Sequence, residues 1–336
     1  MVRYVFAAVL AVVAAAQPAA AQSGLWRHAE TGISLPRSIG EMSLSREQDA
    51  SGGENYDVIL QYGSSQTPVT LYIYRSAYPN AAIWFERTRL AMNQNVGADA
   101  VTVAPRSFAL GGASTPNGLR EEITLPNGAA TGVAIAQIGE WIVKIRVTST
   151  QLDRAGVAAR MDSLLGSLQF SNSTPAPHPL IVPGPCGDGA TMRGEQLRNL
   201  NSRNYAAAAA ASILGYGAAR GIGGLAAEPA LWCRATQTAI PVQLGSLYRR
   251  IDGSGWVALL GDSGRAAAAL LNPVPGNVRA VLFASLPAST HVVAAYDGIP
   301  DPDQGVSVAL PVVVGQATGI AQMGTEPARR PGGRKD

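Results

Sequence analysis

Between residues 55 and 148 the chain repeatedly alternates apolar and polar residues. This period of two is typical of strands with one buried face. The segments that show it are 55–62, 69–75, 100–109, 119–125, 130–138 and 141–148, with shorter strands expected at 31–36 and 42–46. Turn residues such as Asn127-Gly128 and Gly139-Glu140 separate neighbouring segments and favour hairpins. The pattern therefore predicts an antiparallel sheet.

Two segments of the same half change to a helical period. The first apolar stripe consists of Ala81, Trp84, Phe85, Thr88, Ala91 and Met92. It predicts a helix that runs to about Asn95 with Glu86, Arg87 and Arg89 facing outward. The second stripe consists of Val157, Met161, Leu164 and Leu168, after a capping box from Thr150 to Asp153. Together these elements predict an α+β domain, in which two helices cover an antiparallel sheet.

The second half begins with a helical segment and continues as a new series of strands. An alanine-rich run predicts a helix from Ser202 to Leu214, because alanine is the strongest helix former. Strands are expected at 247–252, 256–260, 265–271, 279–286, 291–296 and 306–314. Gly253-Ser254-Gly255 provides a hairpin turn between the first two. The expectation is a helix followed by a small antiparallel β domain, which again belongs to the α+β class.

The stretch from Ser171 to Pro185 separates these halves. It contains five prolines and no Asp, Glu, Lys or Arg. Proline fixes φ and removes a backbone donor, so the stretch favours an extended, semi-rigid linker. We therefore expect one domain over 22–170, the linker over 171–185 and a second domain over 186–323. The Pro/Gly-rich segment 324–336 is expected to be a disordered basic tail.

The first residues have the pattern of a secretory signal peptide. Arg3 gives a positive start, Val5 to Ala15 form a short apolar stretch, and Ala19 to Ala21 form a small-residue cleavage site. Cleavage is expected after Ala21, which leaves no transmembrane segment in the mature chain. The sequence therefore predicts a periplasmic or secreted protein.

The net charge of +3 does not indicate a nucleic-acid partner. Arg3 is expected to leave with the signal peptide, and the remaining excess lies in the tail after Met323. The folded part is therefore about neutral, whereas a nucleic-acid-binding domain carries its positive charge on a folded face.

Both cysteines of the chain, Cys186 and Cys233, lie in the second half. In an exported protein an isolated pair favours a disulfide. A metal site is not indicated, because the pair lacks CxxC spacing and nearby histidines. We expect no cofactor.

The first half resembles the PsbP-like superfamily over about residues 26–170. The resemblance rests on the opening TGISLP (Thr31 to Pro36) and on the order of elements, which ends in a helix and the short strand Leu168 to Phe170. It implies a domain that works by binding or scaffolding and not by catalysis. No binding residue of the family is carried over to this chain.

One group of side chains in this half is suited to binding. Tyr72, Tyr74, Lys144 and Arg146 all lie on the strand face opposite the strongest apolar alternation. If their strands are neighbours, they form an aromatic and cationic patch for an anionic or sugar-like ligand or an envelope protein. The alternative is an ordinary solvated or partly covered sheet face.

Two motifs of the second half carry possible chemistry. Gly261-Asp262-Ser263-Gly264 is similar to the sequence around the nucleophile of chymotrypsin-like serine proteases, but Arg265 stands where that family has glycine. With His291 as base, and Asp262 or Asp297 as a third member, Ser263 would make a secreted serine hydrolase; the simpler interpretation is a tight turn.

Asp297, Asp301 and Asp303 offer oxygens for calcium, although their spacing and the prolines between them favour a rigid exposed turn. No nucleophile–base pair, metal cluster or phosphate loop is evident in the sequence. The expected function is therefore that of a non-catalytic exported envelope protein acting as a binding or scaffolding module. Whether the chain has any catalytic activity is left open.

Overall fold

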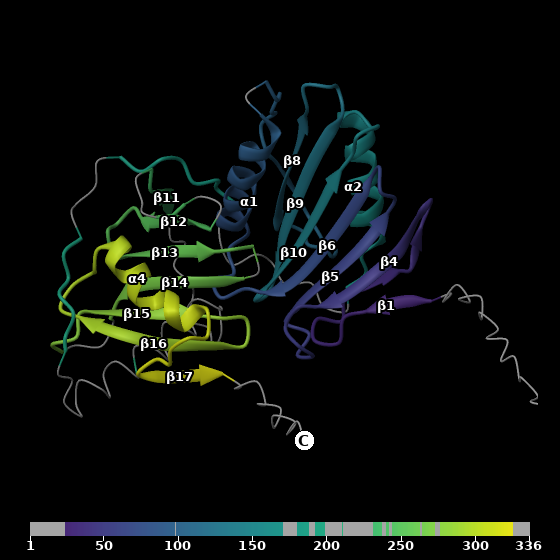
Figure 1. Ribbon diagram of the computed structural model, residues 1–336. Coiled ribbons are helices and arrows are strands. Elements are labelled where there is room, and N and C mark those ends of the chain that lie inside the picture. The colour runs from purple at the N-terminus through teal and green to yellow at the C-terminus, as the bar shows by residue number, and fades with distance from the viewer. Residues whose placement is uncertain are drawn as a thin grey trace, which may run out of the picture.

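The computed structural model describes residues 24–97, 99–170, 180–187, 192–198, 210, 231–236, 240–241, 244–262, 264–272 and 276–324. Within these residues the chain forms helices and antiparallel sheets, which confirms the α+β class (Figure 1). The expected signal peptide, most of the linker, nearly all of the helix from Ser202 to Leu214 and the tail after Gly324 lie outside the described residues. Among the described residues, no helix has the length and apolar character to cross a membrane.

The first sheet has eight antiparallel strands in the order β3-β4-β5-β6-β10-β9-β8-β7. Their bounds are β3 Ser38–Ile39, β4 Met42–Asp49, β5 Asp57–Gly63, β6 Pro68–Arg75, β7 Arg106–Phe108, β8 Gly118–Thr124, β9 Ala130–Ile138 and β10 Trp141–Thr148. A separate ribbon pairs β1 (Leu25–Arg27) with β2 (Ser34–Pro36). The predicted alternation of buried and less buried residues is found in β5 and β6. It is wrong for β8, β9 and most of β10, which are buried on both faces. Of the segment 100–109, only β7 and an isolated bridge at Val101 pair with neighbours.

The second sheet is a meander in which each strand pairs with the next one along the chain. Its strands are β11 Trp232–Arg234, β12 Gly245–Arg250, β13 Gly255–Leu260, β14 Arg265–Leu271, β15 Ala280–Ser285, β16 Ser289–Tyr296 and β17 Ala321–Gly324. The predicted hairpin at Gly253 joins β12 to β13. The Gly261–Gly264 segment is the connection from β13 to β14.

Two helices of the first half lie close to the predicted places. Helix α1 spans Ala81–Val96, and the Asn80 side chain caps its start by accepting from the amides of Ala82 and Ile83. Helix α2 spans Arg154–Ser167. Its N-cap is Asp153, which accepts from the Gly156 amide at 2.8 Å, and not Thr150 as the capping box suggests.

The predicted strand at 306–314 is wrong, because this segment belongs to helix α4 (Pro302–Val313). Asp301 caps the helix by accepting from the amides of Asp303 and Gln304, and Pro302 occupies its first turn. Val306, Ala309 and Val313 then fall on one buried helical face. The valines favour strand locally, but the cap and the packing of this face on the second sheet override that preference.

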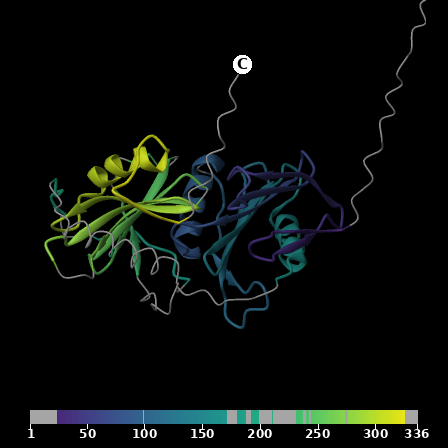
Figure 2. The ribbon, with the colours of Figure 1, turned by 90° about the horizontal axis from the view of Figure 1, so that it is seen from below.

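The helices and sheets are arranged as layers. Helix α2 packs on one face of the first sheet, through Val157, Met161 and Leu164. Helix α1 lies between the two sheets, as the views in Figures 1 and 2 both show. Helix α4 covers the opposite face of the second sheet. One apolar cluster contains residues of α1 and of both sheets, so the two halves share a core.

Candidate functional site: the junction between the two sheets

The four predicted binding residues come from neighbouring strands. In the register of β6 and β10, Lys144 lies opposite Tyr72, and Arg146 lies opposite Thr70. The Lys144 ammonium nitrogen is 4.1 Å from the ring centre of Tyr72 and 5.9 Å from that of Tyr74. This geometry is that of a cation–π cluster.

The second half covers most of this cluster. Tyr74 is 0% exposed and Lys144 is 1% exposed, whereas Tyr72 is half-buried and Arg146 is exposed at the margin. Asp262, in the turn between β13 and β14, places Oδ2 at 2.5 Å from the Lys144 ammonium. The anionic partner of the lysine is therefore a carboxylate of the same chain.

Backbone contacts fix the position of this turn. The Ala77 amide donates to the carbonyl of Gly264 at 2.8 Å. Gly264 has φ +79°, and a Cβ there would lie 2.8 Å from the carbonyl oxygen of Arg75. Only glycine accommodates both this conformation and this close approach. The turn interpretation of the GDSG motif is therefore favoured, with docking against the first sheet as its role.

The hydrolase alternative gains no support from the described residues. His291 lies opposite Ala284 of β15, which in turn lies opposite Ala267 of β14. Two strand spacings of about 4.8 Å each thus separate His291 from β14. The His291 Nε2 atom is 3.0 Å from the Ser289 hydroxyl oxygen. Ser263 lies outside the described residues, so its pairing with His291 stays a prediction.

Burial dominates the electrostatics of the junction. It lowers the pKa of Lys144, and the Asp262 carboxylate offsets part of this effect. Asp57 opens β5 opposite Tyr74 and is also buried. Desolvation raises the pKa of Asp57 to about 6, against the opposing influence of Lys144 and Arg265. Burial likewise raises the pKa of Tyr74 well above its usual value.

Helix α1 provides a second ionic contact across the junction. Glu86 and Arg87 are 1% and 3% exposed, so the prediction that they face outward is wrong. The reason is that the second sheet covers the outer side of α1. Arg234 of β11 donates to Glu86 Oε1, and Arg89 donates to Oε2 at 3.0 Å. A buried carboxylate of the first half is thereby held by a guanidinium of the second.

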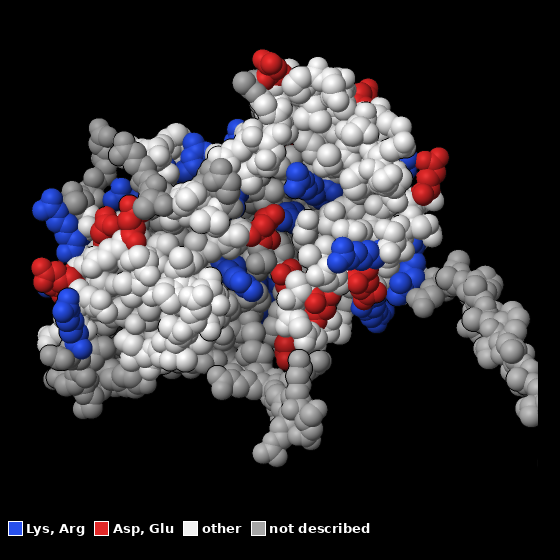
Figure 3. All heavy atoms as spheres, viewed as in Figure 1, with Lys and Arg blue, Asp and Glu red and all other residues white. Residues whose placement is uncertain are grey.

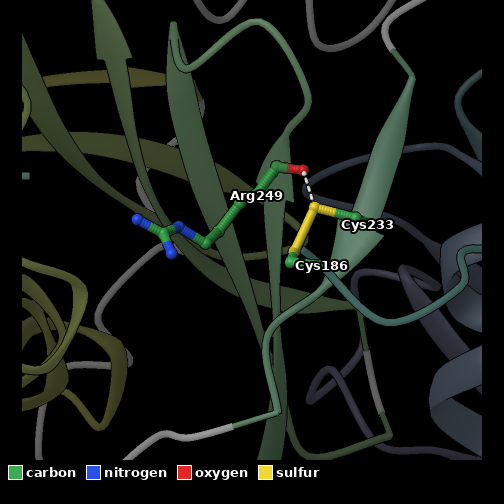
Figure 4. The surroundings of a disulfide bond; sticks show 3 residues. All are labelled: Cys186, Cys233 and Arg249. Carbon is green, nitrogen blue, oxygen red and sulfur yellow. Dashed lines mark hydrogen bonds between the residues drawn. A yellow bond between two sulfur atoms is a disulfide. The ribbon is translucent and has the colours of Figure 1, made fainter. Parts of the chain in front are cut away.

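The strand that supplies Arg234 is tied by the disulfide. Cys186 and Cys233 lie at disulfide distance, as predicted, with Cα atoms 4.8 Å apart. Figure 4 shows the bond beside the Arg249 carbonyl oxygen, which is 3.5 Å from the Cys233 sulfur. The neighbouring Trp232 packs edge-on against Tyr78 of the first half, with ring centres 5.3 Å apart. The disulfide therefore anchors a strand that contacts the first half twice.

The acidic segment before α4 is used for local structure. Asp297 Oδ1 accepts from the Glu195 amide at 2.7 Å, and Asp301 caps α4. Within the described part of the chain, no group of three His, Cys, Asp or Glu side chains is arranged to hold a metal ion. The predicted exposed turn is correct only in part, because Pro302 and Asp303 belong to the first turn of α4 and Pro300 is buried.

Sequence reasoning did not reveal the contacts that join the two halves at the junction. Asp57, Glu86, Arg234 and Asp262 act through contacts between segments far apart in the chain, which period and spacing do not reveal. One signal was present, since Asp262 and the flanking glycines form a tight turn with a charged tip. The glycines of such a turn predict its conformation, but they do not indicate the surface against which the turn packs.

A comparison with solved structures finds similarity to the solution structure of cyanobacterial PsbP (CyanoP) from Synechocystis sp. PCC 6803. The match has 10% sequence identity and a TM-score of 0.32, and it covers 44% of this chain and 91% of that chain. It is a weak resemblance of fold over part of the chain. No protein-family model matches the sequence, and no curated protein matches it.

Proposed function

We propose that this chain is a non-catalytic exported protein that acts as a binding or scaffolding module in the periplasm or outside the cell. The observation that carries this proposal is that charged side chains of the protein are engaged in ion pairs and a helix cap within the fold. Lys144 is paired with Asp262, Glu86 with Arg234, and Asp301 with the amides of α4. These groups stabilise an arrangement of two sheets and leave little for chemistry on a substrate.

In this function, the predicted binding residues hold the two halves of the molecule together and do not contact an external ligand. Tyr72, Tyr74 and Lys144 form the socket that receives the β13–β14 turn, and Arg146 borders it. The two expected domains, 22–170 and 186–323, then act as one body because they share a core around α1. A scaffold of this kind presents surfaces at fixed separation to an envelope partner.

Export and the lack of catalysis are tested together by expression of the full chain in a bacterial host. We expect the protein in the periplasmic or secreted fraction, with a mature N-terminus at Gln22 by mass spectrometry. A fluorophosphonate probe should not label it above the level of a Ser263→Ala control. Cytoplasmic retention of the uncleaved chain would refute export, and labelling that Ser263→Ala abolishes would refute the non-catalytic assignment.

A further inference from the structure

Helix α4 has more apolar surface than its packing on the second sheet requires. Val306, Ala309, Val312 and Val313 are buried. Leu310 and Val314, four residues apart and thus on the same side of the helix, remain 43% and 50% exposed. Figure 3 shows that few charged side chains cover the surface over α4. A second apolar stripe of the helix is therefore left open to solvent.

This stripe forms one wall of a groove. The opposite wall comes from residues that precede β12 and from the end of β13, and it includes Ile240, Leu260 and Leu244, of which Leu244 is 62% exposed. The apolar lining includes Ile240, Leu244, Leu260, Val306, Leu310 and Val314. The cavity measures about 480 Å³. Single exposed aliphatic residues are ordinary, but three that converge on one concave site indicate a ligand.

The polar residues of the groove define the chemistry of that ligand. Ser307 donates to the carbonyl of Gln304, and Asp303 also has an interaction partner. Arg265, at the start of β14, is exposed, and among the described residues no carboxylate forms an ion pair with it. The groove thus combines aliphatic walls with one guanidinium that is available to an anion.

We propose that this groove binds a free, single-chain aliphatic carboxylate, with the chain along α4 and the carboxylate at Arg265. The volume lies in the lower part of the range of about 300–1,000 Å³ for small-molecule sites, which suits one chain and not a two-chain lipid. The inference goes beyond the proposed scaffold role and does not depend on export.

The test is isothermal titration of the full chain with octanoate, decanoate and dodecanoate below their micellar concentrations. We expect one site per chain, with the affinity rising about fourfold for each added methylene, because each is buried against the apolar walls. Titration with decanol measures the contribution of the aliphatic chain of the ligand to the affinity in the absence of a carboxylate. Anionic phosphatidylglycerol vesicles should not bind.

Three variants separate the two parts of the site. Arg265→Gln should lower the affinity for decanoate about tenfold and leave the affinity for decanol unchanged, because only decanoate carries a charge that pairs with the guanidinium. Leu310→Gln should weaken both ligands by about fivefold, since it removes part of the apolar wall. Leu271→Gln is the matched control, because Leu271 is 50% exposed and lies outside the groove.

Several results would overturn the proposal. They are the absence of saturable binding, an affinity independent of chain length, or an equal loss of binding in Leu271→Gln. Binding of the vesicles in place of the free carboxylates would show that the surface recognises a membrane. Failure of this test leaves the export and probe-labelling experiments unaffected, so the two proposals are judged separately.

Discussion

At the scale of single residues, the junction pairs groups of unequal burial. Lys144 is 1% exposed, whereas the side chain of Asp262 is 53% exposed. Removing a buried charge and leaving a buried charge without its partner are different perturbations. Water can solvate Asp262 if the lysine is lost, but it does not reach the ammonium of Lys144 in the same way. The two single variants should therefore differ in their effect on stability.

We predict that Asp262→Asn destabilises the protein more than Lys144→Met does. The first change removes the carboxylate that is paired with a buried ammonium and should cost about 3 kcal/mol of the free energy of unfolding. The second replaces the lysine by an apolar side chain of similar length and should cost about 1 kcal/mol or less. Urea denaturation at pH 7 measures both.

The control for this pair is Arg160→Gln, which breaks an ion pair with the highly exposed Glu41. Exposed pairs contribute little, so this variant should change the free energy of unfolding by less than about 0.5 kcal/mol. Equal losses in Asp262→Asn and Lys144→Met would contradict the assignment of Lys144 as the buried member.

Asp57 gives the junction a pH dependence with a defined sign. Burial raises its pKa to about 6, above its usual value in an unfolded chain. The folded state therefore binds the proton more tightly, and the stabilisation from protonated Asp57 is lost as the pH rises from about 4 through 6.

Asp57→Asn should accordingly be more stable than the unmodified protein at pH 8, by up to about 3 kcal/mol. The difference should close toward pH 4, where the native carboxyl is neutral as well. Urea denaturation at a series of pH values follows the gap between the two proteins. A gap that stays constant from pH 4 to pH 8 would mean that Asp57 titrates normally.

At the scale of elements, periodicity predicts most of the first sheet and both of its helices. It fails where the surroundings of an element, and not its own pattern, decide the outcome. Glu86 and Arg87 look solvent-exposed on an isolated helix, but the second sheet buries them. The segment 306–314 alternates enough valines to resemble a strand, yet the Asp301-Pro302 start and the packing on Trp256 make it α4. The predicted aromatic and cationic cluster exists, but its partner comes from residues 261–264.

The packing of α4 on Trp256 yields a test with a matched control. A Cβ at Gly305 would lie 2.9 Å from Cη2 of the buried Trp256 and closer still to Cζ2. Gly305→Ala should therefore destabilise the protein by about 1–3 kcal/mol, despite the better helix propensity of alanine. A Cβ at Gly166 in α2 would meet no atom within 4 Å apart from its chain neighbours and the backbone of its own helix.

Gly166→Ala should consequently stabilise the protein by about 0.5–1 kcal/mol. Thermal unfolding followed by circular dichroism compares the two substitutions. If both raise the melting temperature, the close contact between α4 and the indole ring is absent in solution.

At the scale of the whole molecule, the disulfide holds in place a strand that forms part of the junction. It closes a loop between residues 47 positions apart and anchors β11, which carries Trp232 and Arg234 to the first half. The double variant Cys186→Ser with Cys233→Ser should lower the free energy of unfolding by about 4 kcal/mol. Urea denaturation of this variant beside the oxidised protein gives the loss. A change below about 1 kcal/mol would mean that β11 is held without the bond.

The central claim is that the two sheets form one body through the core around α1, the Lys144–Asp262 pair and the Glu86–Arg234 pair. Differential scanning calorimetry of the full chain tests it most directly. We predict a single transition whose calorimetric and van 't Hoff enthalpies agree, which is uncommon for two independent domains. Asp262→Asn combined with Arg234→Gln should split it into two. Two separate transitions in the unmodified protein, with midpoints that the double variant does not move, would contradict the account.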